Sequence, residues 1–189
     1  MITVYDNAIN QELLTKLQEI VMSDEMPWFY TPSSAYGTIV DEGVSQGSLY
    51  HLASSPNTRP SFLYPICKEV SNQCLSLVEG DYNIIRARLA LQMWKGLEHI
   101  THSAHVDSEQ EHLVGLLYLN DSDGDTTLYD QEYEWGTPSA PPKVLTKKSE
   151  VHPRANRLVI FDGYHYHSSS APTNYPSRYV INFNWVKEK

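Results

Sequence analysis

The sequence predicts a mainly β protein of the α+β class, with amino-terminal helices packed on one sheet of a jelly-roll core. Three observations lead to this prediction. Helical periodicity is confined to the first 80 residues, and short strand-like segments separated by turn signals follow from residue 82 onward. Several of these segments are apolar at successive positions, which is typical of strands buried between two layers.

The size and charge of the chain limit the possible classes of protein. Its 189 residues favour a single domain, with residues 1–80 as a helical flank with loops and residues 81–189 as the jelly-roll core. No run of about 18 apolar residues and no signal-peptide pattern is present, so we expect neither a membrane span nor secretion. The net charge of −9 argues against nucleic acid as a partner. Cys67 and Cys74 lie in one helical pattern and favour a reduced, cytoplasmic protein.

The amino-terminal part contains two amphipathic helical patterns. Residues 11–22 carry leucine, isoleucine and valine at helical spacing, and Asn10 precedes them as a candidate N-cap. A second pattern runs from about residue 62 to 78, with Pro60 near its start. The intervening segment 23–60 is rich in Ser, Pro, Gly and Tyr and is predicted to form loops with short extended pieces.

The carboxy-terminal part carries the candidate strands of the core. They cover residues 84–94, 112–120, 126–129, 157–161 and 178–186. The proline-rich segment 137–153 lies between them and is predicted to be a long loop, of the kind that often shapes a substrate entrance.

Clustered histidines give the first indication of chemistry, because four of the eight fall between residues 99 and 112. Within the cluster, His105 and Asp107 occupy alternate positions. In an extended chain these side chains point the same way, about 6–7 Å apart at the backbone, so both can reach one ion. A second histidine from a distant strand would complete the two-histidine, one-carboxylate triad that holds Fe(II) and leaves positions open. The His-x-Asp pair alone is not specific.

Further motifs surround this pair in a recurring order. They are His105-Val106-Asp107, residues 116–120, residues 124–129, residues 153–161, Asp162-Gly163, His167, residues 171–174 and Arg178. In order and spacing they resemble the Fe(II)- and 2-oxoglutarate-dependent dioxygenases, particularly the prolyl-4-hydroxylase-like branch and its short phage and bacterial members. The resemblance covers roughly residues 84–186 and is fainter before them, where residues 27–30 also match. It implies a double-stranded β-helix of the cupin-like kind.

The resemblance also implies roles for individual residues. His105, Asp107 and His167 would be the metal ligands and the catalytic centre, with Fe(II) as the metal and 2-oxoglutarate and O2 as cosubstrates. Arg178 would pair with the distal carboxylate of 2-oxoglutarate, assisted by the hydroxyl of Tyr118. An arginine that points into a sandwich needs an anionic partner, and this cosubstrate supplies one.

The implied reaction is hydroxylation of an unactivated C–H bond with release of succinate and CO2. The substrate would be a peptide or protein side chain, with proline favoured by analogy, or a small molecule. A phage-encoded member would act in the host cytoplasm. Nothing in the sequence specifies an oligomeric state.

Other histidines compete for the ligand positions. His165 could share the face of His167, but the spacing after Asp162-Gly163 favours His167 and leaves His165 as a pocket candidate. His99 and His102 form a rival pair without a partner motif at the matching distance.

Additional pocket candidates follow from strand alternation. Asn182 and Asn184 share a face with the arginine that opens the last strand, and they contact either cosubstrate or substrate, or else the backbone. On the strand at 84–94, Gln92 is a pocket candidate, whereas Arg86 and Arg88 are expected only to cap the open end of the strand.

One acidic segment resembles a calcium-binding loop in the spacing of its carboxylates. Asp121, Asp123, Asp125 and Glu132 occupy the ligand positions of an EF-hand-like loop, but Thr126 stands where the loop requires glycine. Strand patterns flank the segment instead of helices, so a turn is predicted.

Two other functions remain open at this point. One is a cupin-like enzyme that uses a divalent metal without 2-oxoglutarate, which would not need Arg178 and Tyr118 around an anion. The other is a non-catalytic jelly-roll binding protein.

Overall fold

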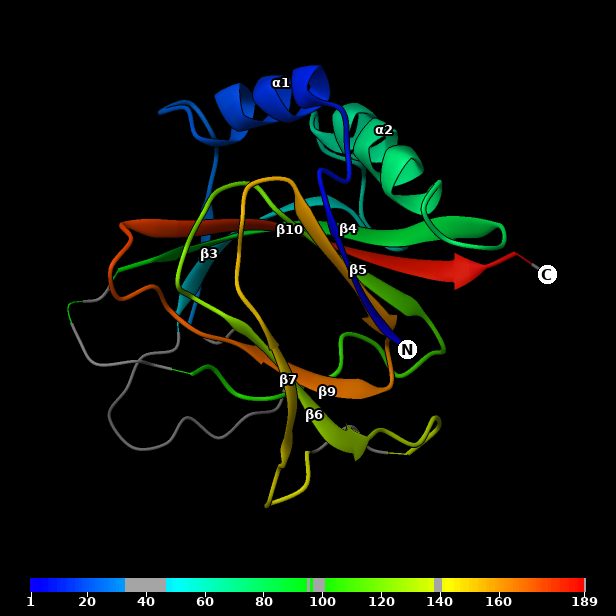
Figure 1. Ribbon diagram of the computed structural model, residues 1–189. Helices are drawn as coiled ribbons and strands as arrows, with labels where there is room; N and C mark the ends of the chain where they lie inside the picture. The colour runs from blue at the N-terminus through cyan, green and yellow to red at the C-terminus, as the bar shows by residue number, and fades with distance from the viewer. Residues whose placement is uncertain (33–46, 95, 97–100, 138–140, 189) are drawn as a thin grey trace.

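The computed structural model describes residues 1–32, 47–94, 96, 101–137 and 141–188. In chain order the elements are β1 (Ile2–Asp6), α1 (Gln11–Val21), β2 (Phe29–Thr31), β3 (Ser48–Ser54), α2 (Tyr64–Leu75), β4 (Tyr82–Met93), β5 (Leu113–Tyr118), β6 (Thr126–Glu132), β7 (Lys147–Val151), β8 (Arg157–Asp162), β9 (His165–Ser169) and β10 (Ser177–Lys187). They form three layers: two helices, a seven-stranded sheet and a three-stranded sheet (Figure 1).

All strand pairs are antiparallel. The strand order is β1-β8-β5-β10-β4-β3-β2 in the large sheet and β7-β6-β9 in the small one. Both helices cover the face of the large sheet that points away from the small sheet (Figure 1). This arrangement confirms a mainly β protein with amino-terminal helices packed on one sheet.

The side chains of β5 explain why its sequence is apolar on both faces. Leu113 and Leu117 pack in the core between the helices and the large sheet. Val114, Leu116 and Tyr118 alternate with them and pack in the second core, between the two sheets. A strand in the middle layer of three layers must be apolar on both sides.

The two helices form where helical periodicity predicts them. The carboxamide oxygen of Asn10 accepts the Leu13 amide at 2.8 Å and caps α1, whose leucines and valine face the sheet. Helix α2 starts with a proline in its first turn and is tied to the sheet by the Trp185 indole, which donates to Ser71 at 2.7 Å. No helix in the described ranges is long and apolar enough to cross a membrane.

β1, β7 and β9 lie outside the candidate strands, whereas β2 and β3 fall in the segment 23–60, where short extended pieces were predicted. β1 and β3 extend the large sheet on both sides, so residues 1–80 contribute strands as well as helices and loops. The prediction of a long loop over residues 137–153 is wrong where β7 forms. β7 carries two lysines and a glutamate and lies at a sheet edge. It is held there by backbone hydrogen bonds to β6, so its sequence shows no alternation of buried and exposed residues.

The topology brings distant segments to one place between the sheets. β10 lies in the middle of the large sheet, between β5 and β4. Opposite it, β9 forms an edge of the small sheet, and the segment before Asp107 pairs with that edge. The amides and carbonyls of His105 and His167 exchange two hydrogen bonds of 3.0 Å, so their side chains start as cross-strand neighbours.

Candidate metal centre

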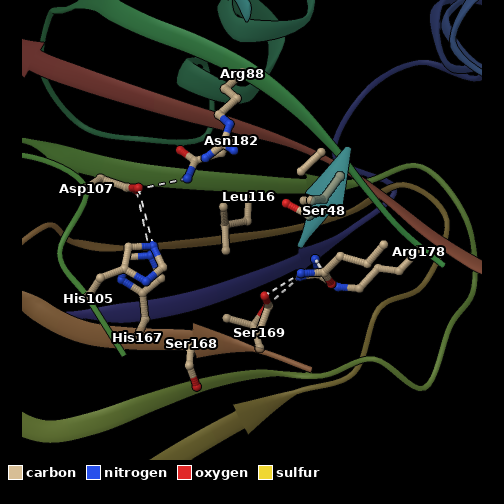
Figure 2. A pocket seen from close by; sticks show the side chains of 14 residues that line it. Ser48, Arg88, His105, Asp107, Leu116, His167, Ser168, Ser169, Arg178 and Asn182 are labelled. Atoms are coloured by element: carbon tan, nitrogen blue, oxygen red, sulfur yellow. Dashed lines mark hydrogen bonds and ion pairs between the residues drawn. The ribbon is translucent and has the colours of Figure 1, made fainter. Parts of the chain in front are cut away.

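The side chains of His105, Asp107 and His167 converge, and their ligand atoms all lie within 4.8 Å of one another. The Asp107 carboxylate has Oδ2 at 3.7 Å from His167 Nε2 and Oδ1 at 3.9 Å from His105 Nε2. Figure 2 shows the two imidazoles side by side beneath this carboxylate. Within the described ranges, no other three His, Cys, Asp or Glu side chains approach one another in this way.

Both imidazoles are oriented as metal ligands. Nδ1 of His105 lies 3.1 Å from the Ser103 carbonyl, and Nδ1 of His167 lies 3.2 Å from the His165 carbonyl. Because a carbonyl oxygen only accepts, each Nδ1 carries the proton and each Nε2 keeps its lone pair for a metal. Burial lowers the pKa of His167 to about 4, with His105 adding to the shift and Asp107 opposing it. The ring is therefore neutral near pH 7, as ligation requires.

The Asp107 carboxylate is buried but well supplied with donors. Its Oδ2 accepts the carboxamides of Asn182 at 2.9 Å and Asn184 at 3.0 Å, and Arg86 Nη1 lies 3.4 Å from Oδ1. Burial raises the pKa of this carboxyl, but the charges of His167 and Arg86 and the bond from Asn182 outweigh burial and hold the pKa well below its usual range. The group is an anion ready to bind a cation.

The two asparagines therefore have a role that neither sequence alternative described. Both bond the Asp107 carboxylate and not the backbone; Asn182 also lines the pocket, so its contact with cosubstrate or substrate stays a prediction. Arg86 belongs to the same network, because its Nη1 also donates to the Asn184 carbonyl oxygen at 3.2 Å. The expectation that Arg86 only caps its strand is wrong. As a result the large sheet holds the acid, whereas the histidines belong to the small sheet and its edge.

A buried guanidinium lies in the same pocket. Arg178 is 2% exposed, and it donates from Nη1 to Gln92 at 3.1 Å and from Nη2 to Thr126 at 2.9 Å. Its buried Nε has no hydrogen-bond partner among the described residues. Burial lowers the pKa of Arg178, although the nearby Tyr118 opposes the shift. A buried guanidinium with neutral partners and a spare donor suits a carboxylate ligand such as that of 2-oxoglutarate.

Thr126 is a pocket residue that the sequence reading missed. Its Oγ1 accepts a hydrogen bond from the Tyr118 hydroxyl at 2.7 Å and another from Arg178, and these two bonds use both lone pairs of the threonine oxygen. The threonine proton must then point to a third group, and Thr126 lines the pocket. Tyr118 is buried behind it and is not among the lining side chains, so its direct contact with a cosubstrate stays a prediction. The only sequence signal was the position of Thr126 within the motif at 124–129.

One pocket of about 60 Å³ contains both features. Its walls come from β3, β4, β5, β6, β9 and β10, and from the segment with His105 and Asp107. The three candidate ligands lie at one end, and Arg178 lies at the other end, beside Ser169 (Figure 2). Gln92 also lines the pocket, as the strand alternation predicts.

The competing histidines lie elsewhere. His102 Nδ1 is 2.9 Å from Gln92 Nε2 and 3.2 Å from the Ser169 hydroxyl, so it supports Gln92 instead of the metal cluster. His165 does not line the pocket; its ring lies against that of Tyr164, at 4.6 Å between centroids. The lining of this pocket gives no support for His165 as a pocket residue, and a role for it at the site stays a prediction. His99 lies outside the described residues.

The acidic segment forms a turn, as predicted. The Asp121 carboxylate accepts the amide of Ala155 at 2.8 Å. The Asp123 carboxylate accepts four bonds from the amides and side chains of Thr173 and Asn174. These carboxylates thus bond different segments and do not converge on a cation.

A family model described as the 2OG-Fe(II) oxygenase superfamily matches residues 91–186, which make up half of the chain. The chain belongs to this superfamily. Its members use Fe(II), 2-oxoglutarate and O2, and this chain is accordingly a 2-oxoglutarate-dependent dioxygenase, an oxidoreductase. The matched range contains the three candidate ligands and Arg178. The cosubstrate of this superfamily, 2-oxoglutarate, is an anion of the kind that the buried guanidinium suits.

Solved structures share the fold of this oxygenase. An oxidoreductase of the 2OG-Fe(II) oxygenase family from Burkholderia pseudomallei superposes with a TM-score of 0.66 at 11% identity, covering 100% of this chain and 86% of that chain. A Trichoplax adhaerens prolyl hydroxylase in complex with a hypoxia inducible factor peptide fragment gives 0.58 at 17%, covering 98% and 83%. HygX from Streptomyces hygroscopicus, with nickel and 2-oxoglutarate bound, gives 0.59 at 11%, covering 98% and 82%. These matches confirm the double-stranded β-helix. No curated protein sequence matches the chain.

Proposed function

We propose that this oxygenase binds Fe(II) through His105, Asp107 and His167 and grips the distal carboxylate of 2-oxoglutarate with Arg178. The observation that carries the proposal is the pocket itself. Three ligand atoms within 4.8 Å of one another share it with a buried guanidinium that has a spare donor. Two imidazoles and one carboxylate fit Fe(II) and leave positions for a cosubstrate.

Each side chain of the site has a defined task. The histidines offer Nε2 while the backbone holds their Nδ1 protons, and the carboxamides of Asn182 and Asn184 orient the Asp107 carboxylate. Gln92 and Thr126 fix the plane of the Arg178 guanidinium, so a planar carboxylate can meet it with two parallel bonds. When bound, Fe(II), 2-oxoglutarate and O2 supply the oxidising power for C–H hydroxylation, with succinate and CO2 as products. Arg178 is 2% exposed, so the protein shields its end of the pocket from bulk water.

The substrate is proposed to be a side chain of a peptide or protein. Support comes from the similarity to the Trichoplax prolyl hydroxylase, which is in complex with a peptide fragment. Proline is favoured by this analogy alone, and a small-molecule substrate is the alternative. We also propose a cytoplasmic location, which the two buried free cysteines support.

Succinate formation tests the proposal. Purified protein with Fe(II), 2-oxoglutarate and O2 should form succinate, and mass spectrometry of incubated peptides should find a product with one added oxygen atom. Arg178→Ala should reduce succinate formation strongly at low 2-oxoglutarate. Metal-dependent turnover that needs no 2-oxoglutarate and does not respond to Arg178→Ala would favour the cupin-like metal enzyme, and the absence of any turnover would favour the non-catalytic protein.

A further inference from the structure

One carboxylate connects the candidate metal position to an arginine. Asp107 Oδ1 lies 3.9 Å from His105 Nε2 and 3.4 Å from Arg86 Nη1. Its Oδ2 lies 3.7 Å from His167 Nε2 and accepts two carboxamides. Figure 2 shows the carboxylate linked to Asn182 and to the imidazoles beneath it. A metal held by the three candidate ligands would therefore be separated from a guanidinium by a single carboxylate group.

Arg86 is fixed next to this carboxylate by a closed ring of hydrogen bonds. Its Nη1 also donates to the Asn184 side-chain oxygen at 3.2 Å, and Asn184 Nδ2 donates to Asp107 Oδ2 at 3.0 Å. Because a guanidinium only donates, the amide oxygen faces the arginine and the amide nitrogen is left for the carboxylate. The Arg86 side chain is 24% exposed and that of Asp107 is 3% exposed, so water screens the charge of the arginine only in part.

The charges of the ligand set make this arrangement important for the metal. Of the three candidate ligands only Asp107 is charged, because the Nδ1 protons of the two histidines leave both imidazoles neutral. Two carboxamides and one guanidinium share the negative charge of this one anionic ligand. Hydrogen bonds and charge around a ligand tune the reduction potential of the metal that it binds. A carboxylate that is engaged in this way stabilises a trivalent ion less than a free carboxylate would.

Three arginines lie near the candidate metal centre, and they differ in position. Arg88 and Arg178 line the pocket itself, so the expectation that Arg88 only caps its strand is wrong. Arg86 is not among the described residues that line the pocket, but its Nη1 forms an ion pair with Asp107 at 3.4 Å. A substitution at Arg86 therefore changes the charge next to a ligand and leaves the lining of the cosubstrate pocket in place.

We infer that Arg86 keeps the bound iron in its ferrous state by opposing the one-electron oxidation of the ion. The inference rests on the proposed function and adds a positioning residue to it, because Arg86 acts through Asp107. In this oxidation Fe(II) loses one electron and becomes Fe(III), and O2, which the reaction already uses, accepts the electron and becomes superoxide. The oxidised ion carries one more positive charge, which the guanidinium repels. An oxygenase that loses its ferrous ion stops turning over, so a site that disfavours this step stays active longer in air.

Redox titration of the iron-loaded protein tests the inference. The midpoint potential is measured without oxygen, with the electron paramagnetic resonance signal of high-spin Fe(III) as the readout. Arg86→Gln removes the charge but keeps an N–H donor, whereas Arg86→Lys keeps the charge but loses the planar fork that orients Asn184. The two variants thus separate the charge of the arginine from its hydrogen bonds.

We expect the ratio of Fe(III) to Fe(II) at a fixed potential to rise about tenfold in Arg86→Gln, because a charge one carboxylate away acts at an effective dielectric constant of about 20. A tenfold ratio corresponds to a midpoint potential about 59 mV lower for a one-electron couple. Arg86→Lys should stay near the wild type. Loss of Fe(II) in air, followed with a ferrous chelator, should be faster in Arg86→Gln. Arg59→Gln removes an equal charge at an exposed site and should match the wild type in both measurements.

Thermal unfolding and Mn(II) titration check that each variant folds and binds metal. If Arg86→Gln does not fold, Arg86→Met serves as the neutral variant, because its apolar stem fills much of the space of the arginine stem. Equal potentials in the wild type and the neutral variant would contradict the inference. A potential that falls as far in Arg86→Lys as in the neutral variant would also contradict it, because geometry would then be responsible and not charge.

These outcomes leave the proposed function standing as long as the wild type consumes 2-oxoglutarate with Fe(II). A wild type that binds iron without consuming 2-oxoglutarate contradicts the proposed function alone. A wild type that binds no iron contradicts both.

Discussion

Replacing Asn184 should loosen the metal site without touching a ligand. The Asn184 side chain is 1% exposed, so water cannot replace its carboxamide when the donor is removed. In Asn184→Leu the side chain keeps its number of heavy atoms and its branching, but Asp107 Oδ2 loses one of its two amide donors, and Arg86 loses an acceptor. The carboxylate is then free to turn toward Arg86 and away from the histidines.

The size of the effect follows from the bonds that are lost. A hydrogen bond to a charged group contributes about 1.5–3 kcal/mol, which sets an upper limit near 100-fold in affinity. Losing an outer partner of a metal ligand typically costs about 10–100-fold in metal affinity. We therefore expect the dissociation constant for Mn(II) to rise about 10–100-fold in Asn184→Leu, with all three ligands still present.

Mn(II) titration by calorimetry measures this change, and the absorption spectrum of the Co(II) form reports whether the coordination has altered. Asn120→Ala is the matched control, because Asn120 bonds the backbone at Ser177 and Tyr179 at the start of β10 and does not contact Asp107. It should lower the melting temperature but leave metal affinity unchanged. Equal Mn(II) affinity and an unchanged Co(II) spectrum in Asn184→Leu would refute the positioning role of this residue.

Three further predictions follow from the geometry. Thr126→Val should raise the dissociation constant for 2-oxoglutarate about tenfold by calorimetry, with Mn(II) affinity unchanged, because Arg178 loses an acceptor that orients it. His167→Ala should abolish metal binding and turnover together, whereas His165→Ala should keep the metal; the reverse result would exchange the ligand assignment. Burial raises the pKa of Asp123, but the bonds from Thr173 and its neighbour outweigh burial and lower the pKa to about 2. Its contribution to stability should therefore be full above pH 3.8 and be lost as the pH falls through about 2, so Asp123→Asn should destabilise the protein at pH 7 but not at pH 2 in chemical unfolding.

The fold was largely predictable because strands that are buried on both faces carry a strong local pattern. β5 is apolar at successive positions, and its side chains face two different cores in turn, whereas helical spacing identifies α1 and α2. β7 could not be found in this way, because its residues are mostly exposed and its pairing with β6 depends on the backbone. β9 was not predicted either, because its two histidines, one tyrosine and two serines have no apolar alternation; it pairs with β6 on one side and with His105 on the other.

The site also contains residues that the sequence predicts and residues that it does not. His105 and Asp107 are two residues apart, so strand geometry alone predicts that they can reach one ion. The two carboxamide donors to Asp107 lie 75 and 77 positions away along the chain, and no local pattern marks an asparagine as the partner of a distant carboxylate. Such contacts depend on which strands the topology places next to one another, so a single sequence does not reveal them.

The three candidate metal ligands are held by two different sheets. The two imidazoles start from one paired edge of the small sheet, where exchanged backbone bonds fix their spacing. The carboxylate reaches across to the large sheet, where the carboxamides of Asn182 and Asn184 hold it. A metal bound by all three groups therefore links the two sheets across the pocket.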